Sequence, residues 1–179
     1  GENHKVVDGY DFVNNDDDPM DDFGHGTHVA ATAAGNGVLK GIAPDAVIYA
    51  YKVLNELGDG SWEGILAAME RSLDPNQDEN PDDRVDIVSM SLGGNGDPDD
   101  LLSQKVDELV DSGIIAVIAG GNDGPYPNSI GSPGNARKAI TVGATYDKPQ
   151  SGSFTYKYCV DTNPDENDVA CFSSRGPVS

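Results

Sequence analysis

Two histidines stand three residues apart in the run Gly24-His25-Gly26-Thr27-His28-Val29-Ala30. An imidazole titrates close to neutral pH, so it can move a proton or bind a metal ion. On a helix this spacing would put both rings on one face, but no cysteine or further histidine is nearby to complete a zinc site. Three interpretations stay open at this point: a pair of metal ligands, a pair of structural histidines, or a general base at His25.

A second candidate group is the Gly-rich run Ala119-Gly120-Gly121-Asn122-Asp123-Gly124. The neutral amide of Asn122 can donate a hydrogen bond to an oxyanion, and losing such a donor costs about 3 kcal/mol of transition-state stabilisation. On composition alone the same run is typical of a plain turn.

Apolar and Ala-rich segments alternate along the chain and predict the elements that must position these residues. We expect helices at 25–34, 62–73 and 99–112, the second capped by Ser61, and strands at 5–13, 47–54, 86–92, 114–119 and 139–144. The strand at 114–119 is apolar throughout, a pattern typical of burial on both faces. The alternation predicts an α/β fold with a parallel sheet and helices on both faces. Active sites of such sheets lie beyond the carboxyl ends of the strands, where Gly93-Gly94 and Gly120-Gly121-Asn122 fall.

Together these motifs resemble the subtilisin-like (subtilase) serine proteases. The histidine run is similar to that family's histidine motif, and further blocks follow in family order at 41–46, 90–94, 119–124, 132–134 and 172–177. The resemblance implies a three-layer, mostly parallel sheet flanked by helices, present here in incomplete form. Residues 1–179 would then be one partial catalytic domain, with about 146–171 as a family-variable insertion.

The resemblance also implies a role for each matching residue. His25 would be the general base of a Ser-His-Asp triad, and Asn122 would donate to the oxyanion. Ser91, Leu92 and Gly93 would pair with the backbone of an extended polypeptide substrate by β-augmentation. Ala119, Gly120 and Gly121 would wall the pocket for the residue before the cleaved bond, where two glycines leave room for large side chains.

The other two members of the triad have no convincing match in this sequence. Asp8, in Val6-Val7-Asp8-Gly9, imitates the family's aspartate motif weakly and lies too near His25. No serine has the context of the nucleophile, since Ser173, Ser174 and Ser179 belong to a turn. We therefore expect a fragment that is inactive alone and needs the remainder of the protease domain as its partner. The alternative is a non-catalytic peptide-binding or structural member of the same fold. A nucleotide-binding domain is disfavoured, since no phosphate-cradling Gly motif opens a helix after a strand.

The acidic loop before His25 carries oxygen donors of the kind that Ca²⁺ prefers, at Asp11, Asn14, Asp16 and Asp18. It resembles a calcium site of some thermostable family members, although Met20 departs from the oxygen-bearing residue expected there. A possible structural calcium ion is one interpretation, and a solvated acidic loop is the other.

Charge and cysteine content bound the remaining possibilities. With 31 acidic and 11 basic residues, the formal net charge of −20 excludes binding to nucleic acid or to an anionic membrane surface through clustered cations. The acidity itself fits solubility, adaptation to salt, or calcium sites. Cys159 and Cys171 are either free thiols or a disulfide, and a disulfide favours a secreted, extracellular protein.

Overall fold

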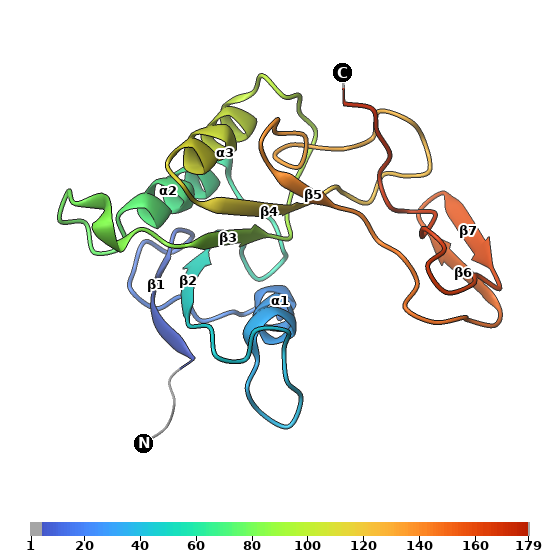
Figure 1. Cartoon of the computed structure of the whole chain (residues 1–179), viewed down its shortest axis with the longest axis horizontal. Coiled ribbons are helices and arrows are strands. Elements are labelled where there is room, and N and C mark those ends of the chain that lie inside the picture. Colours follow the sequence, from blue (N-terminus) through green and yellow to red (C-terminus); the bar gives the residue numbers. More distant parts are fainter. Residues whose placement is uncertain (1–4, 179) are drawn as a thin grey trace. The chain divides into compact units, whose positions relative to one another are not determined.

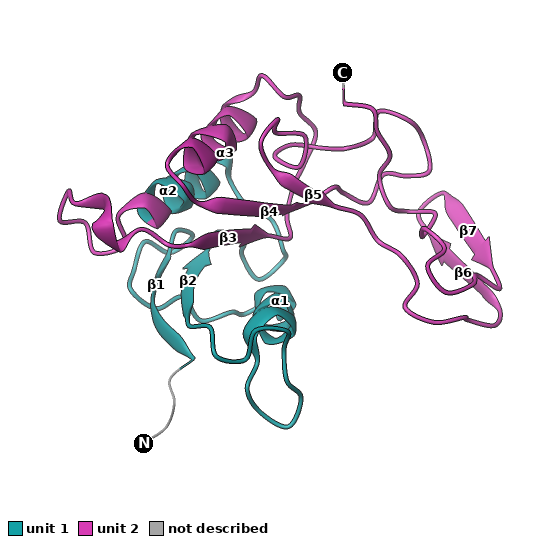
Figure 2. Ribbon diagram, viewed as in Figure 1, with its two compact units in different colours: residues 1–71 teal, residues 72–179 magenta. Residues whose placement is uncertain are grey.

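A computed structural model of the chain describes residues 5–178, so Ser179 and the two ends of the expected domain lie outside the described residues. The chain divides into two compact units, residues 1–71 and 72–179, which Figure 2 colours separately. The expected parallel strands fall into two sheets, one in each unit.

The first unit is built on two parallel strands. β1 (Val6–Asp11) pairs with β2 (Ile48–Lys52), and the register places Asp11 opposite Lys52. Helix α1 (His25–Ala34) lies in the connection between them and packs next to β2. It ends at Gly35, as the sequence predicts, because Gly35 leaves the helical conformation while its N–H still donates to Ala31.

Helix α2 (Trp62–Leu73) crosses the division between the units. The hydroxyl of Ser61 accepts a hydrogen bond from the Gly64 N–H at 3.0 Å, which confirms the predicted N-cap. A short 3₁₀ helix, η1 (Pro81–Asp83), follows in the acidic loop that leads to the second sheet.

The second unit contains a parallel sheet of β3 (Ile87–Met90), β4 (Ile115–Ala119) and β5 (Ile140–Val142), with β4 in the centre (Figure 1). Helix α3 (Leu101–Asp111) packs on β4. Its predicted apolar stripe is buried at Leu102, Val106 and Leu109. Asp100 caps the start of the helix through the Ser103 N–H, at 2.9 Å.

The prediction that β4 is buried on both faces is wrong in this chain. Ala116 and Ile118 are each 1% exposed, whereas Ile115 between them is 50% exposed. Alternate residues of a strand point to opposite faces, and α3 covers only one of them. The sheet neighbours on the open face, Ile87 and Ile140, are about half exposed as well.

The expected insertion at 146–171 holds an antiparallel hairpin of β6 (Ser153–Tyr156) and β7 (Cys159–Thr162). Cys159 and Cys171 form a disulfide, which settles the question that the sequence left open. In residues 5–178, none of the helices combines the length and the apolar character that crossing a bilayer requires.

Candidate active site

His25 is the first residue of α1 and is exposed to solvent. Gly24 precedes it in the left-handed region, at a φ of 96°, and has no side chain to cap the helix. The cap is instead the carboxylate of Asp21. It accepts hydrogen bonds from the N–H groups of Phe23 (3.0 Å) and Gly24 (2.8 Å) and from both the N–H and the hydroxyl of Thr27 (2.7 Å each). Asp21 therefore fixes the backbone on both sides of His25.

These contacts leave an electrostatic signature on Asp21. The Thr27 hydroxyl, followed by the Thr27 N–H, holds the pKa of the Asp21 carboxyl well below its usual value. Asp21 was not predicted as a site residue. It lies three residues before the N-cap position, Gly24, so the usual preference for Asp at an N-cap does not identify it.

His28 lies one turn further along α1, also exposed. The metal interpretation of the two histidines gains no support. Across residues 5–178, no group of three or more His, Cys, Asp and Glu side chains is placed to hold a metal ion.

The acidic loop is organised around Asp11, which is 1% exposed. One carboxylate oxygen accepts the N–H groups of Val13 (2.7 Å) and Asn14 (2.8 Å). The other accepts the Asn14 side-chain amide (2.9 Å) and lies 3.0 Å from the ammonium of Lys52. Burial raises the pKa of the Asp11 carboxyl, but the hydrogen bonds from Asn14 and Lys52 outweigh it and lower the pKa to about 2.

Lys52 joins this loop to the segment that precedes His25. Its side chain is 8% exposed, and its ammonium also lies 2.9 Å from the Asp22 carboxylate. The hydrogen bond to Asp22, followed by the one to Asp11, raises the pKa of Lys52. A buried cation thus neutralises part of the acidic loop from within the chain.

Three of the four expected calcium ligands, Asp11, Asp16 and Asp18, accept hydrogen bonds within the chain. Both oxygens of Asp11 are engaged by protein N–H groups and by Lys52. Asp16 and Asp18 instead accept backbone hydrogen bonds from Asp18 and Met20, at 3.0 and 3.3 Å. Calcium binding by this loop stays a prediction. Isothermal titration calorimetry with calcium tests it.

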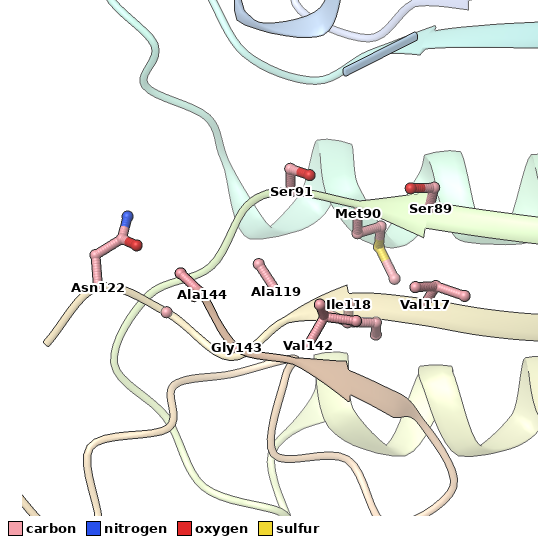
Figure 3. A pocket seen from close by; sticks show the side chains of 11 residues that line it. Ser89, Met90, Ser91, Val117, Ile118, Ala119, Asn122, Val142, Gly143 and Ala144 are labelled. Carbon is pink, nitrogen blue, oxygen red and sulfur yellow. The ribbon is translucent and has the colours of Figure 1, made fainter. Parts of the chain in front are cut away.

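The second unit contains a cavity of about 300 Å³. Its walls come from the carboxyl ends of β3, β4 and β5 and from the loops that follow them (Figure 3). This is the edge at which a parallel sheet is expected to bind its ligands. The lining residues are Ser89, Met90, Ser91, Val117, Ile118, Ala119, Gly121, Asn122, Val142, Gly143 and Ala144.

The cavity brings together four of the expected residues. Ser91, Ala119, Gly121 and Asn122 line it, whereas Leu92, Gly93 and Gly120 do not. The lining residues contributed by β5 and its following loop were not identified from sequence. Nothing in the run Ile140-Thr141-Val142-Gly143-Ala144 distinguishes a cavity wall from an ordinary core strand.

Buried polar side chains support the segment that follows β3. Gly94 and Ser132 exchange two backbone hydrogen bonds of 2.9 Å. The Ser132 hydroxyl donates to Asp100 at 2.9 Å, and the Ser103 hydroxyl donates to Asn135 at 2.7 Å. Ser132 and Ser103 are almost fully buried. This network ties the expected substrate-pairing segment to the start of α3, and no sequence pattern predicts it.

His25 belongs to the first unit and the cavity to the second. Asp8 lies on β1, exposed, with its carboxylate accepting the N–H of Gly9 at 2.8 Å.

Comparison with known proteins identifies the family. The model of the subtilase family matches residues 2–179. Serine protease AprX of Bacillus subtilis (strain 168) is 39% identical over 184 residues, which cover 97% of this chain and 39% of AprX. Minor extracellular protease Vpr of the same organism is 42% identical over 147 residues, or 76% of this chain and 17% of Vpr.

Solved structures agree with the sequence relatives. The chain superposes on S41 Psychrophilic Protease with a TM-score of 0.73 and 34% identity, and on Sphericase with a TM-score of 0.74 and 32% identity. These matches cover 97% and 96% of this chain and 55% of each of the two structures. The chain thus spans about half the length of the solved relatives and 39% of AprX. Its motifs, its α/β fold with parallel sheets and these matches agree, and the chain belongs to the subtilase family.

Proposed function

We propose that this chain is part of a serine endopeptidase and supplies its general base, His25, and its oxyanion donor, Asn122. The observation that carries the proposal is the position of Asn122 on the cavity at the carboxyl end of β4, next to a glycine. Family membership supports the proposal, because the chain belongs to the subtilase family and the motif that resembles that family's oxyanion segment, residues 119–124, contributes to the cavity wall.

In the proposed reaction a serine oxygen attacks the carbonyl carbon of a peptide bond. The serine proton passes to the imidazole of His25, and the carbonyl oxygen becomes an oxyanion that accepts a hydrogen bond from the Asn122 amide. His25 then gives the proton to the leaving amine as the carbon–nitrogen bond breaks, which leaves an acyl-enzyme. Water hydrolyses this ester in a second step of the same kind.

The serine and the aspartate of the triad lie outside these 179 residues in this proposal. The chain alone then cannot form the acyl-enzyme and does not hydrolyse peptides. The position of residues 91–93 directly after the edge strand β3 supports the proposal that they pair with an extended substrate. The disulfide, together with the similarity to a protease named extracellular, supports a secreted protein that acts on polypeptides.

The test compares matched substitutions in the full-length protein. His25→Ala is expected to lower kcat by at least about 10³-fold, whereas His28→Ala, on the same exposed helix, changes kcat only a few-fold. Asn122→Ala is expected to lower kcat by about 10²–10³-fold with little change in KM. Asn76→Ala, which removes an exposed amide on the loop before β3, is the matched control.

A serine-directed fluorophosphonate separates the proposal from its alternative. We expect one adduct on the full-length protein and none on the 179-residue chain. No adduct and no hydrolysis by the full-length protein would favour a non-catalytic, peptide-binding member of the fold.

A further inference from the structure

Asn122 lies in a loop, and the backbone on both sides of it is hydrogen-bonded to one residue that is distant in the sequence. The Ser174 N–H donates to the carbonyl oxygen of Gly121 at 3.1 Å. The Ser174 hydroxyl accepts the N–H of Asp123 at 3.1 Å. Ser174 thus holds the residue before Asn122 and the residue after it.

The approach of the two segments is close enough to require a glycine. Gly121 has a φ of 104°, in the left-handed region that side chains disfavour. A Cβ at this position would lie 2.9 Å from the Ser174 hydroxyl oxygen. Backbone conformation and packing therefore both fit the loop to Ser174.

The segment that carries Ser174 is itself anchored on the opposite wall of the cavity. Ser173, 1% exposed, accepts the N–H of Ala144 through its hydroxyl at 3.0 Å. The guanidinium of Arg175 donates to the carbonyl oxygen of Ser173 at 2.8 Å. Residues 173–175 therefore connect the loop after β4 with the loop after β5, both of which line the cavity.

A second contact reaches the Asn122 loop from the turn of the β6–β7 hairpin. The ammonium of Lys157 lies 2.6 Å from the Asp123 carboxylate, and this hydrogen bond raises the pKa of Lys157. The hairpin is joined to the segment before Ser174 in two ways: by the Cys159–Cys171 disulfide and by the packing of Tyr156 on Phe172, whose ring centroids are 4.9 Å apart. Phe172 in turn accepts the Gly124 N–H at 2.9 Å through its carbonyl oxygen.

We infer that Ser174 and Lys157 are positioning residues for Asn122, with the disulfide-linked hairpin serving as a brace that holds the oxyanion loop in place. This inference rests on the proposed function for its catalytic meaning, but its structural content is independent of activity. Neither residue touches the reacting atoms in this scheme. Ser174 orients the loop backbone, and Lys157 restrains Asp123 from the solvent side.

The first experiment measures amide hydrogen exchange of residues 121–124 by NMR in the full chain. Ser174→Ala removes the acceptor of the Asp123 N–H, and we expect exchange at Asp123 to rise about tenfold, the effect of losing one hydrogen bond. Ser174→Thr keeps the hydroxyl and should restore most of the protection. Ser112→Ala is the matched control, because it removes a serine hydroxyl bonded to Glu108 at the end of α3.

Lys157→Gln has an equally close control in Lys138→Gln. Lys138 pairs with Asp111 in the same unit, and the exposed fractions of the two side chains, 44% and 66%, nearly equal the 42% and 58% of Lys157 and Asp123. An exposed pair contributes little to stability. We therefore expect only Lys157→Gln to shift the side-chain amide resonances of Asn122 and to raise exchange in its loop, by about two- to threefold.

Unchanged exchange at 121–124 in both Ser174→Ala and Lys157→Gln, or equal changes in their controls, would overturn the inference whatever the activity. In the full-length protein the same two variants are expected to lower kcat more than they raise KM, because they displace a group needed mainly in the transition state. Faster exchange with an unchanged kcat would leave the brace intact as a structural finding. It would overturn the claim that Ser174 and Lys157 position Asn122 for catalysis, whereas Asn122→Ala tests the role of Asn122 itself.

Discussion

The two residues that we propose as general base and oxyanion donor are held in different ways. The backbone around His25 is held by Asp21, which accepts hydrogen bonds from the nearby residues Phe23, Gly24 and Thr27. Asn122 is positioned by Ser174 and Lys157, whose bonds to Asp123 span 51 and 34 residues. A helix start needs only a nearby oxygen to accept its free N–H groups. A loop after a strand has no such local partner, so it takes support from other segments.

This contrast has consequences for stability. Substitutions of Asp21 should loosen only the first turn of α1. Substitutions of the residues that hold Asn122 should loosen several segments, because these residues lie in the loops after β4 and β5 and in the β6–β7 hairpin.

The largest expected effect comes from removing the disulfide that anchors the hairpin. The Cys159→Ala/Cys171→Ala variant opens a loop with a sequence separation of 12 residues, and we expect the free energy of unfolding of the second unit to fall by about 3 kcal/mol. Urea unfolding measures this fall, and hydrogen exchange locates it. The Asn122 loop should lose protection while α1 keeps its own, so equal loosening of α1 would contradict the contrast drawn above.

A smaller effect, confined to the first unit, is expected from Asp11. Its pKa falls from 3.8 to about 2 on folding, so the ionised carboxylate stabilises the folded state above about pH 4, and this stability is lost as the pH falls towards 2. The difference corresponds to about 2 kcal/mol. In Asp11→Asn we expect the loss of stability relative to the unchanged protein to be largest near pH 6 and to shrink below pH 4.

Denaturant unfolding at a series of pH values measures this linkage. Asp22→Asn removes the exposed partner of Lys52 and should cost no more than about 1 kcal/mol. A cost for Asp11→Asn that stays constant between pH 6 and pH 2.5 would show that the carboxylate charge does not stabilise the loop.

The smallest effect is expected at the cap of α1. Asp21→Ala leaves the Gly24 and Thr27 N–H groups without their acceptor and should cost about 1 kcal/mol, with faster exchange only in the first turn of α1. Asp21→Asn keeps one acceptor oxygen, so its stability should lie between that of the unchanged protein and that of Asp21→Ala. Ser61→Ala at the start of α2 gives the scale of an ordinary cap, and fraying that extends to Ala34 would show that α1 has no support beyond Asp21.

The sequence predicted the elements better than it predicted their surroundings. The bounds of α1 and α3 agree with the patterns of Ala-rich and amphipathic residues, because the spacing of apolar residues and the residues that end a helix are read from adjacent positions. The predicted burial of both faces of β4 was wrong at Ile115. The apolar run 114–119 does not indicate which face of the strand another element covers.

By itself the sequence determined the family, and it predicted the roles proposed for His25 and Asn122, because each stands in a run of neighbours whose order is specific. Only the tertiary structure decided that Asp11 is neutralised by Lys52, that the cysteines are joined, and that Ser174 holds both sides of Asn122. The physical reason is distance along the chain. A motif is written in adjacent residues, whereas a contact between residues 123 and 174 exists only after strands and loops have been brought together by folding.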